Sequence, residues 1–434
     1  MKAAVLLATC VLASCGYGSY VHMPSSACRA DFCRRAGGCC PTLAELDGTV
    51  KPRQFSDGCV LLENGRVLCS DRNRDGAAGI GRVAVGKDMP WLAVRDIDDG
   101  IELATDAGSS RCVVRTGGAV DCWGNNTHGQ IGGAPGVHRA RPGRVLAVGS
   151  ASAVEFTEGA ACALRESGEV VCWGLGVRIL RGFIDAEECP RDRRGRYACW
   201  GPRGKRVMIA DAIDLAGSLD GFCAALSNGQ VHCWARDRKM YADHQPHLPW
   251  VYPPAALAGA RDVVALDGNV GRIWALDTGG HMSFWGRFSA GASASSNACE
   301  VIPSVPVHKP WRIDDFGDIT AIANECGLRS DGRVVCWTSR SGAELVDDLG
   351  GVTSLIPGLG PRGERCARDA QGEVWCWRDG APPVRWSGLP DPFASKYRDG
   401  SECSMQCPAF AQMGWSWATE PAQHATVAPP PPRG

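Results

Sequence analysis

The chain has 434 residues, of which 44% are hydrophobic and 21% charged, and its 46 basic and 47 acidic residues nearly cancel. This balance excludes a wholly disordered chain and a strongly basic nucleic-acid binder, and the length suits two or three domains or one large repeat architecture. The 55 Gly, 27 Pro and 23 Cys argue against a mainly helical protein and against a reducing compartment.

The N-terminus has the features of an export signal. Lys2 precedes an apolar run over residues 3–13, which is too short to span a membrane but typical of a secretory signal. The run ends in Leu12-Ala13-Ser14-Cys15-Gly16, which resembles the bacterial lipobox. We therefore expect residues 1–14 to be removed and Cys15 to carry a lipid anchor, with Gly16 favouring the outer membrane. The alternative is a plain signal peptide with a cysteine near its cleavage site.

The body of the chain repeats a pair of cysteines ten positions apart, with a glycine six positions after the first cysteine. One more unit, the fifth in chain order, keeps this frame with Trp274 and Phe284 in the two cysteine positions, which makes seven units. Most units start 50–53 residues after the one before. The six pairs are Cys59 and Cys69, Cys112 and Cys122, Cys162 and Cys172, Cys223 and Cys233, Cys326 and Cys336, and Cys366 and Cys376.

One unit predicts a β-hairpin closed by a disulfide. Residues 162–165 and 169–173 alternate like half-buried strands, and a three-residue loop ending in a left-handed Gly168 would place Cys162 opposite Cys172. Directly opposed residues have Cα atoms about 4.5–5.5 Å apart, which a disulfide can bridge. Trp173 would then point to the other face of the hairpin.

A third short strand precedes each hairpin, for example at residues 212–215 and 262–265, and the remaining residues of each unit can hold a fourth. About four strands in about 50 residues, repeated seven times, predict an all-β, seven-bladed β-propeller over residues 43–390. An open β-solenoid of the same period is the alternative, but it would need polar caps that the sequence does not show.

The second unit, residues 112–132, reads CVVRTGGAVDCWGNNTHGQIG. It resembles the repeat of the RCC1 (regulator of chromosome condensation) family, in a cysteine-rich bacterial lipoprotein form. The resemblance implies a seven-bladed propeller, and the family includes secreted inhibitors of β-lactamases. The Gly-Asn-Asn-x-x-Gly-Gln-x-Gly tail, residues 124–132, is complete only in this unit. Nuclear members act on a small GTPase through a hairpin, but we expect neither that partner nor nucleic acid for an exported chain.

An insertion follows the third unit at residues 179–206. It contains Cys189 and Cys199, again ten apart, and predicts an extra disulfide-closed hairpin. The segment is rich in arginine and is either a solvated arm or a surface that binds an acidic protein or glycan. The candidate partner-binding residues are Arg191, Arg193, Arg194 and Arg196.

Segments at both ends flank the predicted ring. Residues 15–42 form a Cys-rich linker, and residues 391–434 form a tail that ends in Pro-rich sequence. The seven remaining cysteines could bind zinc or pair with one another, and an exported chain favours disulfides whose connectivity the sequence does not fix. They are Cys28, Cys33, Cys39, Cys40, Cys299, Cys403 and Cys407.

Functionally, the sequence indicates a cell-envelope binding scaffold for a protein or glycan ligand. The nine histidines do not recur in register, so we expect no catalytic residues, cofactor or resident metal. One alternative is an envelope hydrolase with its site at the ring's centre, which inward carboxylates with raised pKa would favour. Another is a structural spacer of surface assemblies.

Overall fold

The computed structural model describes most of residues 40–389 and three short strands outside that range. The strands outside are β1 (Tyr20–Met23), β31 (Cys403–Gln406) and β32 (Ser416–Ala418). Within 40–389 the description leaves out 71–72, 74, 86–89, 107–108, 147, 158, 175–204, 207–208, 219–220, 236–253, 269–271, 287–306, 314–316 and 339–341. β1 pairs with β31, and β32 pairs with β5 (Val83–Val85).

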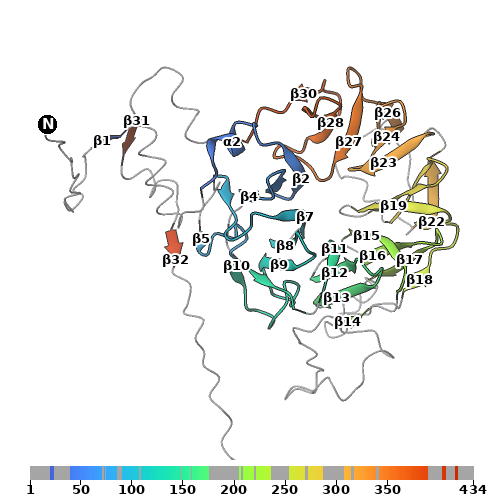
Figure 1. Ribbon diagram of the computed structural model, residues 1–434, viewed down its shortest axis with the longest axis horizontal. Coiled ribbons are helices and arrows are strands. Elements are labelled where there is room, and N and C mark those ends of the chain that lie inside the picture. Colours follow the sequence, from blue (N-terminus) through green and yellow to red (C-terminus); the bar gives the residue numbers. More distant parts are fainter. Residues whose placement is uncertain are drawn as a thin grey trace, which may run out of the picture.

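Seven four-stranded antiparallel sheets form a ring (Figure 1), which confirms the predicted seven-bladed propeller. In each blade the strands follow chain order, and the first strands of neighbouring blades contact one another all the way round, from β2 to β27 and back to β2. We call these seven first strands the inner ring.

The strands of the first four blades are β2 (Pro52–Ser56), β3 (Cys59–Leu62), β4 (Val67–Cys69) and β6 (Leu92–Ala93); β7 (Gly100–Thr105), β8 (Ser110–Arg115), β9 (Val120–Gly124) and β10 (Arg139–Arg144); β11 (Ala151–Thr157), β12 (Ala160–Arg165), β13 (Val170–Gly174) and β14 (Lys205–Arg206); and β15 (Ala212–Ser218), β16 (Gly221–Leu226), β17 (Val231–Ala235) and β18 (Ala255–Ala256). Those of the last three are β19 (Val263–Gly268), β20 (Arg272–Asp277), β21 (Met282–Gly286) and β22 (Val307–Ile313); β23 (Ile319–Ala323), β24 (Cys326–Arg329), β25 (Val334–Thr338) and β26 (Gly342–Leu345); and β27 (Val352–Ile356), β28 (Arg365–Asp369), β29 (Val374–Trp377) and β30 (Val384–Arg385).

The predicted cross-strand disulfides are present in six blades. Cys162 lies opposite Cys172, with Cα atoms 4.0 Å apart, and Gly168 has a φ of +80° in the turn. The other five pairs have the same register: 59–69, 112–122, 223–233, 326–336 and 366–376. In the fifth blade Trp274 and Phe284 occupy these places, with ring centroids 4.8 Å apart.

The two faces of each hairpin pack against different neighbours. Cys162 and Cys172 lie in a core cluster with residues of blade 4, including Leu215. Trp173 points the other way, as predicted, into a cluster that contains Cys112 and Cys122 of blade 2. Each disulfide is therefore buried in the apolar contact between two blades.

A repeated hydrogen bond links successive blades. In the first six blades, the carbonyl of the hairpin-turn glycine accepts from the N–H of the first residue of the next inner strand, at 2.8–3.1 Å. Gly229 and Val263 form one such pair, at 3.0 Å. A Cβ on Gly229 would lie 2.6 Å from the Cα of Asp262. The glycine thus provides the turn and also allows the next blade to approach.

The junction between the last and first blades differs. Pro52 opens β2 and has no N–H to donate, and a Cβ on Gly372 would meet no atom within 4 Å. Instead, the Arg368 guanidinium donates to the carbonyl of Pro52 at 3.0 Å, and Lys51 pairs with Glu373 at 3.1 Å. Helix α2 (Leu43–Leu46), which has a capping box, joins this junction through a 2.8 Å bond from the N–H of Leu389 to the carbonyl of Leu46.

The Gly-Asn-Asn-x-x-Gly-Gln-x-Gly loop of blade 2, residues 124–132, packs onto blade 3. The Asn126 amide donates to the carbonyls of Gly132 and Ala134, which folds the loop on itself. The indole N–H of Trp173 then donates to the carbonyl of Gln130 at 2.7 Å. In the described residues, this motif therefore contributes a hydrogen bond to the contact between blades 2 and 3.

Several predicted features lie outside the described residues. These are the signal segment, Cys15, and Cys189 and Cys199 with the four arginines of the insertion. The last two residues of the predicted insertion, Lys205 and Arg206, form β14 and pair with β13, so blade 3 resumes before residue 206. No helix among the described residues is long and apolar enough to cross a membrane.

Candidate functional site on the inner ring

Each strand of the inner ring contains a β-bulge at its second residue. The register shifts between the first and third residues of all seven strands. The bulged residues are Arg53, Ile101, Ser152, Ile213, Val264, Thr320 and Thr353, and all seven are exposed. Bulges re-aim side chains and are frequent next to functional sites.

Three of the bulged residues are apolar. Ile101, Ile213 and Val264 are 39%, 47% and 42% exposed, and we call them the apolar collar. In contrast, the hydroxyls of Thr320 and Ser152 donate to carbonyls of their own blades at 3.1 and 3.3 Å. The hydroxyls therefore form hydrogen bonds within their own blades. The collar residues instead expose large apolar side chains to solvent.

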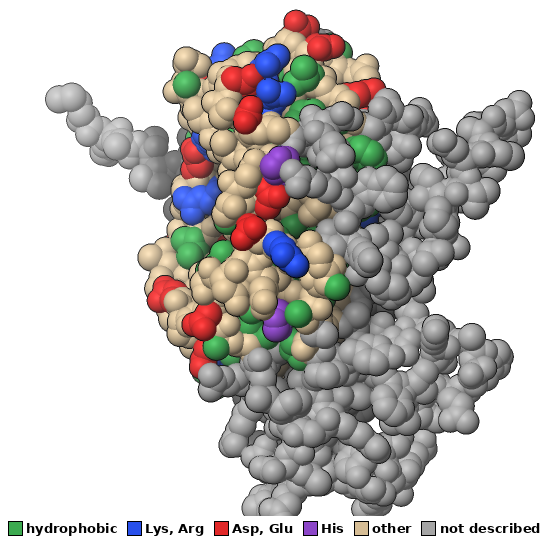
Figure 2. Space-filling model, turned by 90° about the vertical axis from the view of Figure 1, so that its right-hand side faces the viewer, with side chains coloured by type: hydrophobic (Ala, Val, Ile, Leu, Met, Phe, Trp, Pro, Cys, Tyr) green, Lys and Arg blue, Asp and Glu red, His purple; other side chains and the backbone are tan. Residues whose placement is uncertain are grey.

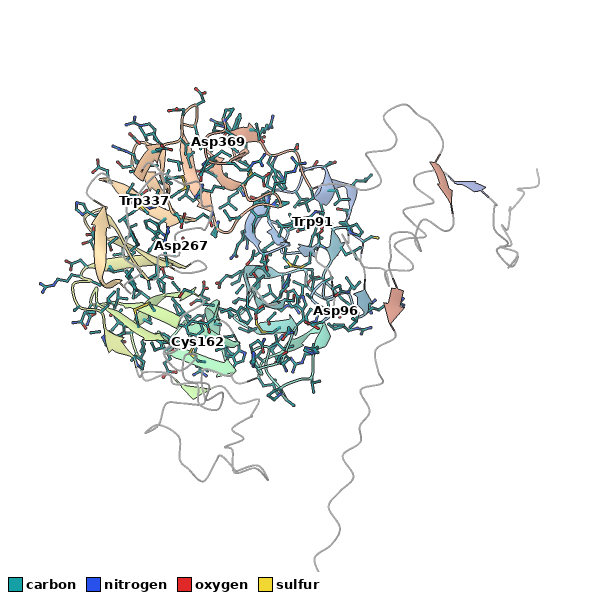
Figure 3. The ribbon with its side chains drawn as sticks, turned by 180° about the vertical axis from the view of Figure 1, so that it is seen from behind. Trp91, Asp96, Cys162, Asp267, Trp337 and Asp369 are labelled. Carbon is teal, nitrogen blue, oxygen red and sulfur yellow. A yellow bond between two sulfur atoms is a disulfide. The ribbon has the colours of Figure 1, made fainter. Side chains whose placement is uncertain are left out.

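Four carboxylates lie on the inner strands of four consecutive blades. They are Glu102 on β7, Glu155 on β11, Asp214 on β15 and Asp267 on β19. We call them the acidic quartet. Figure 3 shows Asp267 on the inner side of the ring. All four residues keep intermediate solvent exposure, but Oε2 of Glu102 is inaccessible and has no hydrogen-bond partner in the described part of the chain.

The quartet ties each blade to the next through backbone amides. Glu102 Oε1 accepts from the N–H of Val154 at 3.2 Å, and Asp214 Oδ2 accepts from that of Leu266 at 2.7 Å. Asp267 Oδ2 accepts from the N–H of Asn324 at 2.9 Å. One role of these carboxylates is therefore structural, as for uncharged Gln54, which bonds Leu103 in the same way.

Burial raises the pKa of each member of the quartet, and repulsion by other members adds to this for Glu102, Glu155 and Asp267. Burial is the main cause for all four, and it raises the pKa of Glu102 to about 8, of Asp267 to about 7 and of Asp214 to about 6. The pKa of Glu155 rises well above its usual value, through burial and then the negative charges of the other three. The quartet therefore holds protons near neutral pH.

Two arginines pair with Glu325, whose negative charge also raises the pKa of Asp267. Asn324 and Glu325 form the turn between β23 and β24, with φ of +56° and +65°. The Glu325 carboxylate pairs with Arg272 at 3.1 Å and with Arg365 at 3.4 Å. Among the described residues, no basic side chain lies within ion-pair distance of the quartet, which agrees with its raised pKa values.

The described residues contain no group of three or more His, Cys, Asp or Glu side chains that could hold a metal ion. Cys40 is disulfide-bonded, but its pairing, like that of the other six remaining cysteines, stays open.

The sequence pattern predicts the strands that carry the collar and the quartet but does not identify either group as a site. The signal was an acidic residue inside a short run of strand-forming residues, as in Ile213-Asp214-Leu215. The bulge that exposes Ile213 beside Asp214 is a feature of strand pairing that a single strand does not show.

No protein-family model matches the chain, and no curated protein matches its sequence. The fold is a seven-bladed propeller that resembles solved structures of RCC1 proteins. Human WBSCR16 superposes with a TM-score of 0.50 at 17% identity, over 75% of this chain and 94% of that one. Prp20p from Saccharomyces cerevisiae, described with its binding properties to Gsp1p and histones, gives 0.51 at 16% identity, over 78% and 89%.

Proposed function

We propose that this propeller is an extracytoplasmic scaffold that binds a protein ligand at the inner ring. The observation that carries the proposal is the apolar collar beside an acidic quartet that has no counter-ion among the described residues. A rigid ring held by six buried disulfides presents these groups at fixed positions, which lowers the entropy lost on binding. The disulfides also suggest a location outside the cytoplasm.

The proposed setting is the cell envelope, with Cys15 as the lipid anchor and the outer membrane as the destination. The lipobox-like sequence supports the anchor, and Gly16 supports the outer membrane. The arginines at 191, 193, 194 and 196 remain a second proposed contact, because the segment carries a local excess of positive charge.

The collar can be altered without disturbing the blades. Threonine occupies the equivalent bulge in blades 6 and 7, so Ile213→Thr with Val264→Thr keeps the fold while removing exposed apolar surface. Val384→Thr is the matched control, because Val384 is 60% exposed on the outer strand β30.

The test is capture from envelope extracts by a lipid-free chain starting at residue 16. We expect the wild type and the Val384→Thr control to retain the same partner and the collar double variant to lose it. Equal recovery by all three would remove the inner ring as the binding site. Neutralising residues 191–196 in parallel tests the second contact.

A second candidate, an envelope hydrolase, is favoured by one observation. A carboxyl group with a raised pKa is suited to donate a proton, and glycosidases use pairs of such groups. If the quartet is catalytic, Glu102→Gln and Glu155→Gln abolish hydrolysis of cell-wall glycans or esters. Hydrolysis that survives both substitutions, or is absent from the wild type, excludes this candidate.

A further inference from the structure

The loops that join one blade to the next are strongly acidic. Six of them connect an outermost strand to the following inner strand, so they all lie at the end of the ring where the inner strands begin. We call this end the junction face. Its described loop residues include eight aspartates and two arginines: Asp96, Asp98, Asp99, Asp211, Asp262, Asp318, Asp347 and Asp348 against Arg95 and Arg261.

Most of this negative charge is not neutralised within the described part of the chain. Asp98 and Asp99 pair with Arg115, at 3.4 and 2.5 Å. In contrast, Asp211, Asp262 and Asp318 are exposed and have no ion-pair partner among the described residues. Figure 2, an edge-on view, shows acidic side chains spread over the described surface of the ring.

The backbone conformation explains why Asp, Asn or Gly is favoured at these positions, but it does not explain why the residue is charged. Asp211, Asp262 and Asp318 have φ of +60°, +56° and +61°, a region that Asp, Asn and Gly tolerate best. Glycine serves at the equivalent place in blade 7, where Gly351 has a φ of +67°. Asparagine or glycine would meet the structural need equally well, so the carboxylates are free to serve recognition.

The unpaired aspartates stand next to the apolar collar. Asp211 lies two residues before Ile213, and Asp262 lies two residues before Val264. The surface therefore places exposed apolar side chains beside unpaired negative charges. Such a surface complements a partner that carries apolar and positively charged side chains. Like charges across an interface disfavour binding, and opposite charges speed association.

We propose that the junction face is a docking surface for a protein segment that carries lysine or arginine around an apolar tip. The collar receives the tip, and the aspartates pair with the basic side chains. The acidic quartet lies on four of the same inner strands. This inference rests on the proposed binding function and names the chemistry of its partner.

The test uses two fluorescent twelve-residue peptides, one of alternating Lys and Leu and one of alternating Glu and Leu. Anisotropy is measured with the chain from residue 16 onward, at 50 and 300 mM NaCl. We expect the Lys peptide alone to bind, and to bind more weakly at high salt. The variant Asp211→Asn/Asp262→Asn/Asp318→Asn should bind it about five- to tenfold more weakly, from three exposed ion pairs.

The matched control is Glu344→Gln, an exposed acidic residue on the outer strand β26. It should leave affinity unchanged, and an unaltered melting temperature of the triple variant shows that asparagine preserves the loops. Equal affinity of the triple variant and the wild type, or equal binding of the Glu peptide, would overturn the proposal. If a ligand from envelope extracts still binds through the collar in the triple variant, the proposed function stands and only this assignment of its partner fails.

Discussion

The contact between each hairpin turn and the next blade provides a sharp test of how the ring is held. Gly229 and Gly372 occupy the same place in their turns, with φ of +78° and +79°. Replacing either with alanine imposes the same left-handed strain, about 1–2 kcal/mol. Only Gly229 faces a following blade closely, because its added Cβ would lie 2.6 Å from the Cα of Asp262 and 2.8 Å from its N.

The difference between the two variants therefore measures the contact between blades. Relieving the overlap at Gly229 requires blade 5 to move, which costs about 1–3 kcal/mol by analogy with overpacked cores, and strains the bond between the Gly229 carbonyl and Val263. We expect Gly229→Ala to lower the free energy of unfolding by about 2–5 kcal/mol and Gly372→Ala by about 1–2 kcal/mol. Gly332→Ala should fall between them, since its Cβ would lie 3.2 Å from the Cα of Gly351.

The assay is urea unfolding under oxidising conditions, followed by tryptophan fluorescence and far-UV circular dichroism. Coincident transitions by the two probes are required before free energies are compared. If Gly229→Ala and Gly372→Ala lower the free energy of unfolding equally, the reasoning is refuted. The close contact of Gly229 with the next blade would then contribute nothing to stability.

Two further predictions concern the disulfides and the quartet. Replacing Cys162 and Cys172 together with alanine should lower the free energy of unfolding by about 3 kcal/mol, as expected for a cross-link closing a short loop; a loss of less than about 1 kcal/mol in the same urea assay would contradict this. Because the pKa of Glu102 is raised to about 8 in the folded chain, the proton it holds stabilises the fold at low pH, and this stability is lost as pH rises from about 4.5 to 8. Glu102→Gln should therefore be more stable than the wild type at pH 8.5, by roughly 1–3 kcal/mol after allowance for solvent screening. At pH 4 the variant should show no such gain. Equal pH dependence of the two proteins would mean that Glu102 is charged in the fold.

The sequence predicted the parts of the fold that repeat at a fixed spacing. The register of Cys162 with Cys172, the turn at Gly168 and the opposite direction of Trp173 all follow from strand alternation within one hairpin, and the structure confirms them. The paired loss of both cysteines in the fifth unit correctly indicated that Trp274 and Phe284 touch.

The candidate site could not be predicted because it depends on contacts between blades. In the sequence, Glu102 is one residue of a short β-branched run, and only the position of Val154 on the next blade shows what holds its carboxylate. The exposure of Ile213 depends on a bulge, which is a property of paired strands. Likewise, the sequence does not show that the hydrogen bonds between turn glycines and inner strands stop at Pro52. That follows from the contact between the last blade and the first.

Site-specific photo-crosslinking tests most directly whether the inner ring binds a protein. A photoreactive phenylalanine analogue replaces Ile213 in one strain and Val384 in another, both in the cells that make the protein. We expect irradiation to join a second protein to the chain when the probe is at 213 and not when it is at 384. No adduct at 213, or the same adduct at both positions, would contradict the assignment of the inner ring as the binding site.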